Sequence, residues 1–527
     1  MEIPPKRSPM PAAESQDPQQ DARQRAQTVL FWTAAALAAL CIDFGSFHRL
    51  HNSDSLVPVL ESLWRWTPFY WEQDRFGMLV PLLAIPFRSP LANLLAQSAA
   101  NVFCGLAGFF LCARYVVPKA WLITGALSAS LFLLCNGADA RFLYLGLSQP
   151  YGVGMFLGFA GLLLLENSRR SRALRIALSL ICLLAASWVD AAVLFVLLPL
   201  IIFRGYFDRA AAPESGRGER QNICRQLMFG AKRSLDLDTG IAMALVILSF
   251  VASYIYSGIV SYSAAYGDWP YAPVQPWRLP VVWLEFGKTV WSDYLSQPWG
   301  ISVAALIVLG VIVRLMTRGK NERTNSPAAI LIASSVASFL LMGSLAHIRD
   351  TEFDSRFALQ SMVLLQIAAV AWALLPIFSL LNLSGRRVAT AAAMSLFLAA
   401  PLYLYGWPSL ARVRADLHET LGQYTPEILQ SGATQIIGDY WNVWPATFDV
   451  NLALYEAGSE RRVWGVTTRS TPTQIYWSKI PPDKMRFAAV AGDTAVPYVV
   501  DLYSLPPLTV VQNLKDIVIL APSANPQ

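Results

Sequence analysis

The side chains that could carry chemistry gather in two short segments, and the first lies between residues 48 and 90. Asp54 stands in HNSDS, and Glu72, Asp74 and Arg75 follow in FYWEQDRFGM. A carboxylate can act as a general base toward a hydroxyl group, and an arginine can bind and neutralise a phosphate. The first segment therefore offers a candidate base and candidate contacts to a phosphate or an acceptor.

The second segment is AHIRDTEFDSRF, which covers residues 346–357. It contains His347, Arg349 and Arg356 among three carboxylates. Arginine or histidine can stabilise the charge that develops on a phosphate leaving group. The two segments together could supply the base and the phosphate-binding groups of one transfer reaction.

Each candidate also has a purely structural interpretation. Asp54 could only cap the helix that follows it, and the charges at 72–75 could form a local ion-pair group at the surface. Arg349 and Arg356 could pair with carboxylates of their own loop, and His347 could be an ordinary loop histidine. Both kinds of role remain open on the sequence.

The elements that must position these residues are membrane-spanning helices. Of the 527 residues, 55% are hydrophobic and only 14% are charged, and the mean hydropathy is +0.41. Ordinary globular proteins are about 25% charged, and a helix needs roughly 20 apolar residues to cross a bilayer. This composition excludes a soluble fold. Apolar segments occur near 29–47, 91–113, 119–135, 150–165, 174–189, 191–203, 240–260, 299–316, 327–345, 358–381 and 388–406.

The distribution of basic residues predicts which loops face the cytoplasm. The apolar stretch 174–203 is interpreted as two short helices that turn at residues 188–190, because a single span would place an arginine cluster outside. Eleven spans follow, with residues 1–27 as a disordered cytoplasmic tail and the C-terminus outside. The outer loops that this topology predicts are 48–90, 259–298 and 346–357. Both chemical segments therefore lie on the outer face.

The first outer loop contains two short apolar elements. SDSLVPVLESLWRW (53–66) predicts an amphipathic helix on the membrane surface, with Ser53 or Asp54 as its N-cap. MLVPLLAIPF (78–87) is too short and too broken by proline to span, so it should lie in the interface or re-enter. Aromatic residues between them, such as Tyr70 and Trp71, are interpreted as an interfacial belt.

The composition changes after Trp407, and no later segment could span a membrane. Residues 28–406 are therefore predicted to form the membrane module and 407–527 a soluble exoplasmic α/β domain. The β-rich stretches are 434–441, 461–468, 486–493 and 508–520, after a helical stretch at 409–430.

Charge and cysteine content argue against other classes of function. The net charge of +6 resides mainly between apolar segments, so it fits membrane topology and does not indicate nucleic-acid binding. The six cysteines lie in apolar runs or in a basic linker, and there is no CxxC motif or Cys/His cluster. A zinc or iron–sulfur site is therefore not indicated.

The order of features resembles the GT-C class of integral-membrane glycosyltransferases. In that class a first span leads to an outer loop with an acidic residue at the start of an interfacial helix. A second polar motif then opens a short apolar helix, and another span follows. The matching stretches here are HNSDSLVPVLESLW, YWEQDRFGMLVPLLAIPF and SPLANLLAQSAANVFCGLAGFFLCARY. The likeness continues through the helix pair at 174–203, through Arg356-Phe357 at the mouth of a span, and through the C-terminal domain.

The resemblance implies transfer of a sugar from a polyprenyl-phosphate or diphosphate carrier, with inversion, on the outer side of a bacterial inner membrane. The acceptor would be an envelope glycan, a glycolipid or a protein. By position, Asp54 matches the catalytic acidic residue of the class. Arg75, His347, Arg349 and Arg356 are candidates to hold the carrier phosphate.

Two departures from the class pattern leave details open. Many members have paired acidic residues where Asp54 is followed by Ser55, and QDRFG replaces the Lys/His-Pro-Pro form of the second motif. Donor type and a role for a divalent metal are therefore undecided. The alternative function is a non-enzymatic flippase or transporter of lipid-linked glycans. Transporters place ionisable residues near the midplane, whereas most charges here are predicted at the outer mouth, which favours an enzyme.

Overall fold

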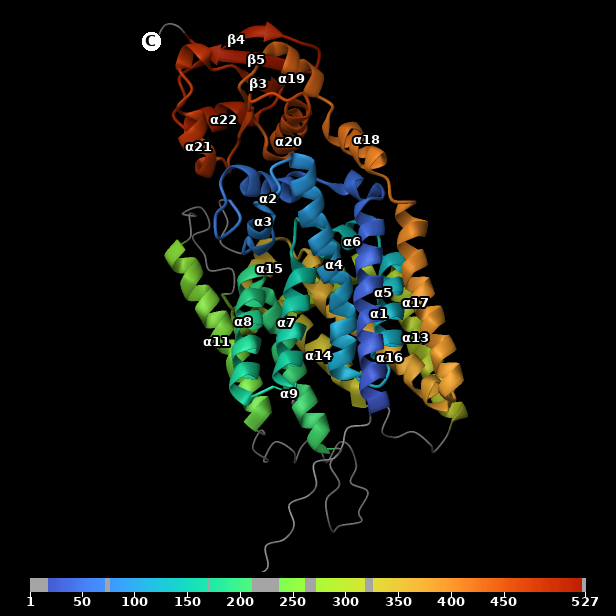
Figure 1. The fold of residues 1–527 in the computed structure, drawn as a ribbon. Coiled ribbons are helices and arrows are strands. Elements are labelled where there is room, and N and C mark those ends of the chain that lie inside the picture. The colour runs from blue at the N-terminus through green and yellow to red at the C-terminus, as the bar shows by residue number, and fades with distance from the viewer. Residues whose placement is uncertain are drawn as a thin grey trace, which may run out of the picture.

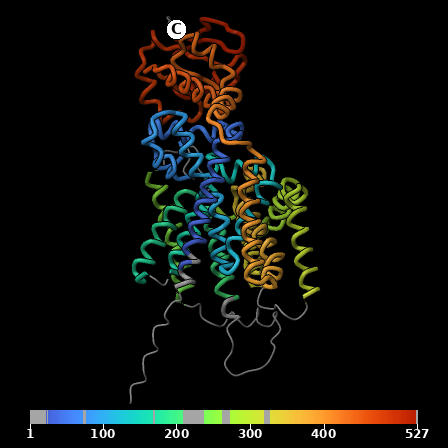
Figure 2. Tube along the Cα trace, turned by 45° about the vertical axis from the view of Figure 1, so that its right-hand side comes forward, coloured from blue at the N-terminus to red at the C-terminus, as the bar shows by residue number. Residues whose placement is uncertain are grey.

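The molecule is built in three layers (Figure 1). The computed structural model describes residues 18–71, 76–167, 170–210, 237–260, 272–317 and 326–523. Long helices form a bundle, short helices that include α2 and α3 cover one end of it, and the C-terminal α/β unit sits on these short helices. The view turned by 45° shows the same order of layers (Figure 2).

The bundle contains eleven apolar helices within the described residues. Seven are long and apolar enough to cross a membrane, and four are shorter. They coincide with the eleven apolar segments of the sequence and confirm a polytopic helix bundle. The seven long helices are α1 (Pro18–Asp43), α4 (Pro90–Val116), α8 (Arg172–Val189), α11 (Leu237–Val260), α13 (Pro298–Met316), α16 (Leu359–Leu380) and α17 (Leu383–Tyr405). The shorter helices are α5 (Trp121–Cys135), α7 (Tyr151–Leu165), α9 (Leu194–Ala210) and α14 (Ser326–Met342).

The stretch 174–203 forms two helices, as predicted. The chain turns at Asp190 through the 3₁₀ turn η2 (Ala191–Val193) between α8 and α9. The buried Asp190 carboxylate accepts hydrogen bonds from the Gln360 side-chain amide at 2.6 Å and from the Ala192 N–H at 3.1 Å. These bonds satisfy a buried acid and tie the turn to α16.

One boundary of the prediction was wrong. The sequence predicted a disordered tail over residues 1–27. Helix α1 begins at Pro18, so residues 18–27 are helical. The polar residues that precede the apolar run continue the same helix because they include good helix formers such as Gln, Ala and Arg. Residues 1–17 lie outside the described part of the chain.

Short elements connect the long helices. In chain order they are η1 (Ser46–Leu50), α2 (Ser53–Trp64), α3 (Leu79–Ala84), α6 (Ala138–Leu145), η4 (Pro276–Arg278), α12 (Leu279–Val290), the π-helix η5 (Trp291–Leu295), α15 (Ala346–Asp350) and η7 (Ser355–Ala358). Helix α3 is a single short apolar helix and does not span, as the sequence predicted.

Helix α2 begins with a capping box one residue earlier than expected. The Asn52 side chain accepts a hydrogen bond from the Ser55 N–H at 3.2 Å, and the Ser55 hydroxyl accepts one from the Asn52 N–H at 2.9 Å. The prediction of Ser53 or Asp54 as N-cap was therefore wrong. Asp54 occupies the first turn, and its carboxylate is available to other partners.

Helix α2 is covered from both sides. It packs against α4 of the bundle and against α20 (Tyr440–Glu456) of the C-terminal unit. Nine of its twelve residues are buried, including Leu56 and Leu60 of the predicted apolar stripe. The helix expected to lie on the membrane surface is thus enclosed between two layers of protein.

The C-terminal unit is an α/β fold with a five-stranded sheet in the order β2-β1-β3-β5-β4. Strands β2 and β3 lie on the two sides of β1 and run parallel to it. Strand β5 pairs antiparallel with β3, and β4 pairs antiparallel with β5 at the edge of the sheet. The strands are β1 (Gln435–Ile437), β2 (Trp464–Val466), β3 (Phe487–Val490), β4 (Leu508–Asn513) and β5 (Ile517–Pro522). The other helices are α18 (Leu410–Leu421), α19 (Thr425–Ser431), α21 (Thr471–Trp477), η8 (Pro482–Lys484) and α22 (Ala495–Leu502). Each predicted β-rich stretch contains at least one strand.

Reporter fusions would test the predicted topology. The Ser409 N–H donates to the Phe44 carbonyl at 2.7 Å, so the C-terminal unit lies at the end of the bundle where α1 stops. The end of α9 lies at the opposite end (Figure 1), and Lys and Arg concentrate between residues 204 and 233. A reporter active only outside the cytoplasm should work at the C-terminus and be silent after Ala210. Activity of a cytoplasm-only reporter at the C-terminus would contradict the topology.

Candidate active site

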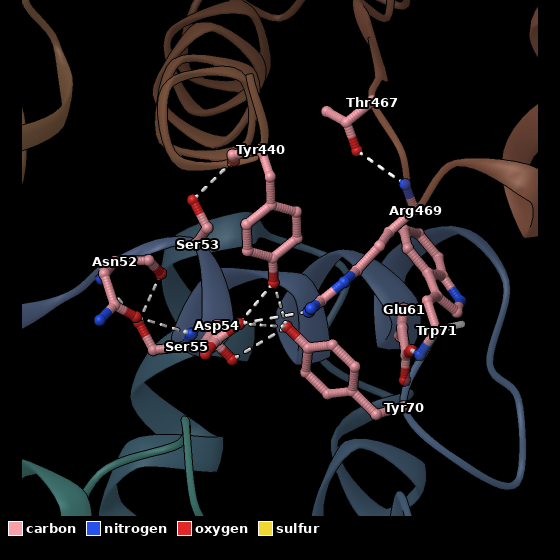
Figure 3. A network of polar contacts seen from close by, with 10 residues as sticks. All are labelled: Asn52, Ser53, Asp54, Ser55, Glu61, Tyr70, Trp71, Tyr440, Thr467 and Arg469. Carbon is pink, nitrogen blue, oxygen red and sulfur yellow. Dashed lines mark hydrogen bonds and ion pairs between the residues drawn. The ribbon is translucent and has the colours of Figure 1, made fainter. Parts of the chain in front are cut away.

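Asp54 lies where the short helices meet the C-terminal unit (Figure 3). The Tyr440 hydroxyl donates a hydrogen bond to Asp54 Oδ1 at 2.6 Å, and Arg469 Nη1 lies 3.6 Å from the same oxygen. The Tyr70 hydroxyl is 2.6 Å from the Tyr440 hydroxyl and 3.4 Å from Oδ1. The Arg469 guanidinium also lies over the Tyr440 ring, 4.4 Å from its centroid. We call these four residues, Asp54, Tyr70, Tyr440 and Arg469, the Asp54 cluster.

The two oxygens of the Asp54 carboxylate have different surroundings. Oδ1 takes the three side-chain contacts, whereas Oδ2 has no hydrogen-bond partner among the residues that the structure describes. The side chain is 17% exposed. One oxygen is thus held in place while the other can accept a hydrogen bond from a bound hydroxyl, which is the geometry that a general base requires.

The topology of the sheet brings Tyr440 and Arg469 to α2. Strands β1 and β2 are parallel neighbours, so the chain leaves both at the same edge of the sheet. Tyr440 follows the end of β1 at the start of α20, and Arg469 follows the end of β2. Open α/β sheets characteristically place functional residues at the carboxyl ends of their parallel strands.

Gly438 is required for the turn that leads into α20. Its φ is +144°, and a Cβ there would lie 2.2 Å from Asp493 Oδ2. That same oxygen accepts the Asp439 N–H at 2.7 Å, and Asp439 in turn caps α20 by accepting the Trp441 N–H at 2.9 Å. This network holds the first turn of α20, and with it the Tyr440 side chain, against α2.

The two tyrosines of the Asp54 cluster act as donors. Burial raises the pKa of Tyr440 and of Tyr70 well above the ordinary value, and the negative charge of Asp54 raises both further. Both hydroxyls therefore keep their protons at neutral pH. They stabilise the Asp54 carboxylate by donating toward it.

Further contacts attach the C-terminal unit to the first loop. Arg49 Nε donates to Asp416 Oδ1 of α18 at 2.7 Å, and the Ser53 hydroxyl donates to the Tyr440 backbone carbonyl at 2.9 Å. The Asp54 cluster is therefore one part of a continuous polar interface.

A second carboxylate of α2 has a different environment. Glu61 is fully buried, and its Oε1 accepts the Trp71 N–H at 2.6 Å. Burial raises the pKa of the Glu61 carboxyl well above its usual range, and the Trp71 hydrogen bond offsets this only in part. The raised pKa favours the protonated form of Glu61. It anchors the chain after α2, where the Trp71 ring packs on Trp444 of α20 at 5.6 Å.

A chain of buried polar side chains links the end of α1 to the start of α2. His48 Nε2 lies 2.5 Å from the Asp43 carbonyl, and its Nδ1 lies 2.8 Å from His51 Nε2. His51 Nδ1 is 3.0 Å from the Ser55 hydroxyl. Burial, and next the neighbouring His48, lower the pKa of His51 well below its ordinary value, so this ring is neutral. These buried contacts position the first turn of α2.

The arginines of the second segment pair within their own loop. Arg356 Nε lies 3.0 Å from Asp354 Oδ2, and Arg349 lies 2.7 Å from Asp350. The Arg356 side chain is 22% exposed and lies just before α16. The ion pairs match the structural interpretation of both residues. A role in phosphate binding stays a prediction.

The remaining predicted site residues are His347 and the three charged residues at 72, 74 and 75. The His347 ring meets Phe357 edge-on, with 5.2 Å between centroids. Glu72, Asp74 and Arg75 lie outside the described residues. Within the described ranges, no group of three or more His, Cys, Asp or Glu side chains could hold a metal ion.

Sequence reasoning missed Tyr440, Arg469 and Glu61. Tyr440 lies near the end of the predicted β-rich stretch 434–441 and Arg469 directly follows the stretch 461–468, but only the parallel pairing of β1 and β2 shows that the two side chains converge. An available signal for Glu61 was an acidic residue inside an otherwise apolar helix. The interpretation of Tyr70 and Trp71 as an interfacial belt was wrong, because both are buried against the C-terminal unit.

The layers described here, with an acidic residue at the start of a short helix over an apolar bundle, agree with the likeness to the GT-C class inferred from the sequence. Among solved structures, ArnT from Cupriavidus metallidurans bound to undecaprenyl phosphate is similar, with a TM-score of 0.45, 13% identity, and 95% of this chain and 99% of that chain covered. Its apo state gives a TM-score of 0.43 and 12% identity, covering 96% and 100%. A variant of the arabinofuranosyltransferase AftD from Mycobacteria gives 0.40 and 12%, covering 95% of this chain and 42% of that chain.

Comparisons of sequence found no relative. No protein-family model matches the chain, and no curated protein matches it. At identities of 12–13% and TM-scores below 0.5, the structural likeness concerns the arrangement of elements alone. The function is therefore argued from the residues of this chain.

The buried Glu61 makes a prediction about stability and pH. The raised pKa means that Glu61 holds its proton to a higher pH in the folded state than in the unfolded state, where its ordinary pKa is 4.5. The free energy of unfolding should therefore fall as the pH rises from that value toward the raised pKa. Glu61→Gln keeps an acceptor for the Trp71 N–H and needs no proton, so it should remove this loss.

Thermal unfolding of the detergent-solubilised protein near pH 5 and near pH 8 measures the effect. Wild type should lose more stability between the two than Glu61→Gln does. Asp501→Asn, which changes an exposed acid of α22, should behave like wild type. Identical pH dependence in wild type and Glu61→Gln would show that Glu61 is not held neutral.

Proposed function

We propose that this protein transfers a sugar from a polyprenyl-phosphate carrier to an acceptor hydroxyl at the outer face of the membrane. The observation that carries the proposal is the Asp54 carboxylate, which lies between the bundle and the C-terminal unit with Oδ1 held by Tyr440 and Oδ2 open. The order of sequence features that resembles the GT-C class supports the same reaction. Residues 28–406 would form the membrane module and 407–527 an exoplasmic domain.

The proposed reaction is a displacement at the anomeric carbon of the donor. The acceptor hydroxyl donates its hydrogen bond to Asp54 Oδ2 and attacks the anomeric carbon. A new glycosidic C–O bond forms as the bond to the phosphate oxygen breaks, with inversion. Asp54 takes the proton of the hydroxyl, and the carrier leaves as its phosphate. Tyr440 and Arg469 act through Oδ1, as positioning residues that fix the direction of Oδ2.

The second segment is the proposed place of the carrier phosphate. Arg356 precedes α16, an apolar helix of the bundle, so a phosphate at its guanidinium would lie at the end of the apolar bundle, where a prenyl chain could continue into the membrane. Asp354 holds Arg356 from one side and would keep the guanidinium oriented. Arg349, which is more exposed, is the second candidate. The acceptor would be an envelope glycan, a glycolipid or a protein, and membrane lipid would surround the bundle.

Removal of the Asp54 charge tests its role as base. Asp54→Asn keeps the size of the side chain and leaves the Asn52 cap intact, so the protein should fold and insert. General-base catalysis is worth about 10²- to 10⁴-fold, and sugar transfer from a polyprenyl-phosphate donor in membranes should fall by that factor. Ser53→Ala removes only the hydrogen bond to the Tyr440 carbonyl and should retain most of the activity. Transfer by Asp54→Asn within a few-fold of wild type would leave Asp54 a structural residue.

Binding of undecaprenyl phosphate to purified variants tests Arg356. A charge-assisted hydrogen bond is worth about 1.5–3 kcal/mol, so Arg356→Ala should weaken binding about 10- to 100-fold. Arg356→Lys should recover only part of it, because lysine lacks the planar fork of arginine. Arg414→Ala, which removes an exposed ion pair with Glu456, serves as the control for loss of charge. Equal affinity of wild type and Arg356→Ala would move the phosphate site to Arg75 or elsewhere.

A further inference from the structure

Helix α12 packs one of its faces against the bundle. On this face Val282 and Phe286 are 3% and 0% exposed. The Phe286 ring stacks on the Phe339 ring of α14, with 4.9 Å between centroids and 5° between planes. The Trp283 ring N–H donates to the Leu340 carbonyl at 3.0 Å. These contacts fix α12 against the last turns of α14.

The opposite face of α12 is exposed and largely apolar. Positions 281, 284 and 288 are three and four residues apart, so their side chains lie on one side of the helix. Large apolar side chains on this face and at its two ends are more than half exposed, namely Trp277 (73%), Val281 (61%), Leu284 (59%) and Trp291 (63%). An exposed apolar surface of this kind marks a contact with another protein or with a membrane.

The place of α12 in the fold indicates what covers this face. Helix α14 is an apolar helix of the bundle and leads to α15, toward the end that carries the C-terminal unit (Figure 1). Val336 lies four residues before Leu340, on the side of α14 that α12 covers, and is 52% exposed. Four helical residues rise about 6 Å, so lipid reaches α14 one turn deeper than α12 does. The exposed face of α12 therefore continues a lipid-facing surface at the level where the membrane ends.

The side chains around the exposed face suit the boundary between acyl chains and headgroups. Tryptophan is enriched at that depth, and Trp277 and Trp291 stand at the two ends of α12. Lys288 pairs with Glu285 at 2.7 Å, and the aliphatic stem of a lysine can lie along lipid while its ammonium group stays near water. Arg278 is exposed beside Trp277 and can meet a lipid phosphate. These groups favour a lipid surface over an apolar protein partner.

We propose that α12 is an interfacial anchor whose exposed face inserts into the membrane leaflet on the side of the C-terminal unit. Phospholipid acyl chains contact Val281 and Leu284, and headgroups meet Arg278 and Lys288. Amphipathic helices of this kind reach about 5–10 Å into the boundary between headgroups and acyl chains, which agrees with the place of α12 one turn above Val336. The inference does not depend on the proposed function, because it requires only that α14 belongs to the membrane bundle.

Photocrosslinking of the full-length protein in liposomes of phosphatidylethanolamine and phosphatidylglycerol tests the insertion. The photoreactive residue p-benzoylphenylalanine replaces Val281 or Leu284, one position at a time, and after irradiation it forms a bond to whatever lies beside the side chain. A phospholipid adduct, measured as a mass increase of the protein, should form at both positions. The same residue in place of Val251 on α11, which is 43% exposed in the bundle, should give a comparable yield. In place of Tyr498 on α22, which is 60% exposed in the C-terminal unit, it should give no lipid adduct.

The other possible occupants of the face give different products. A cross-link to residues 261–271, which lie outside the described part of the chain, would show that the chain itself covers α12. A covalent dimer would show that a second copy covers it. Protein without any adduct at Val281 and Leu284, while Val251 reacts with lipid, would place the face in water. Each of these three results would overturn the inference.

A charged substitution on the same face provides a second measurement. A carboxylate in the membrane interface loses part of its hydration, whereas substitutions of residues exposed to water change stability little. The midpoint of thermal unfolding in the liposomes should therefore fall for Leu284→Asp. Leu502→Asp, at an exposed leucine of α22, is the matched control and should leave the midpoint unchanged. Equal shifts in the two variants would contradict the insertion of α12.

Discussion

The contact on which the other features depend is the enclosure of α2 between an apolar bundle and a polar α/β unit. A helix buried on both faces must satisfy every polar group it carries from one side or the other, because an unpaired buried charge costs several kcal/mol. Asp54 contacts Tyr440 and Arg469 of the C-terminal unit, and Oε1 of Glu61 accepts the Trp71 N–H of its own chain segment. The C-terminal unit is therefore part of the site and not a separate appendage.

Two carboxylates on one short helix are given different properties by their surroundings. Glu61 is fully buried, its pKa is raised by that burial, and its Oε1 binds the Trp71 N–H. Asp54 keeps some access to solvent and lies beside a guanidinium, with one oxygen open. Enzymes that need a base commonly obtain it in this way, by placing chemically similar groups in unlike environments. The environment of Asp54 depends on the carboxyl edge of a sheet that is almost four hundred residues further along the chain.

The two sides of α2 have different chemical surroundings. On the bundle side, the described residues around Gln97 and Ser148 are uncharged and leave two buried acceptor atoms without a hydrogen-bond partner, and toward the C-terminal unit lies the charged Asp54 cluster. Tyr70 belongs to both, with its ring on one side and its hydroxyl on the other.

The sequence by itself determined the elements whose formation is local. The length of the apolar segments predicts the eleven helices, and the positions of the arginine clusters predict the turn at Asp190. The β-rich stretches between turn residues predict the strands. Asp54 could be proposed as a site residue from the sequence because its place at the start of α2 is also a local feature. The capping residue of α2 and the start of α1 were misplaced because neighbouring polar residues differ little in propensity. Only the tertiary structure decided that Tyr440 and Arg469 meet Asp54, since that contact requires the parallel pairing of β1 with β2 and joins residues separated by 386 positions. No pattern within either segment indicates that residues so far apart in the sequence are in contact.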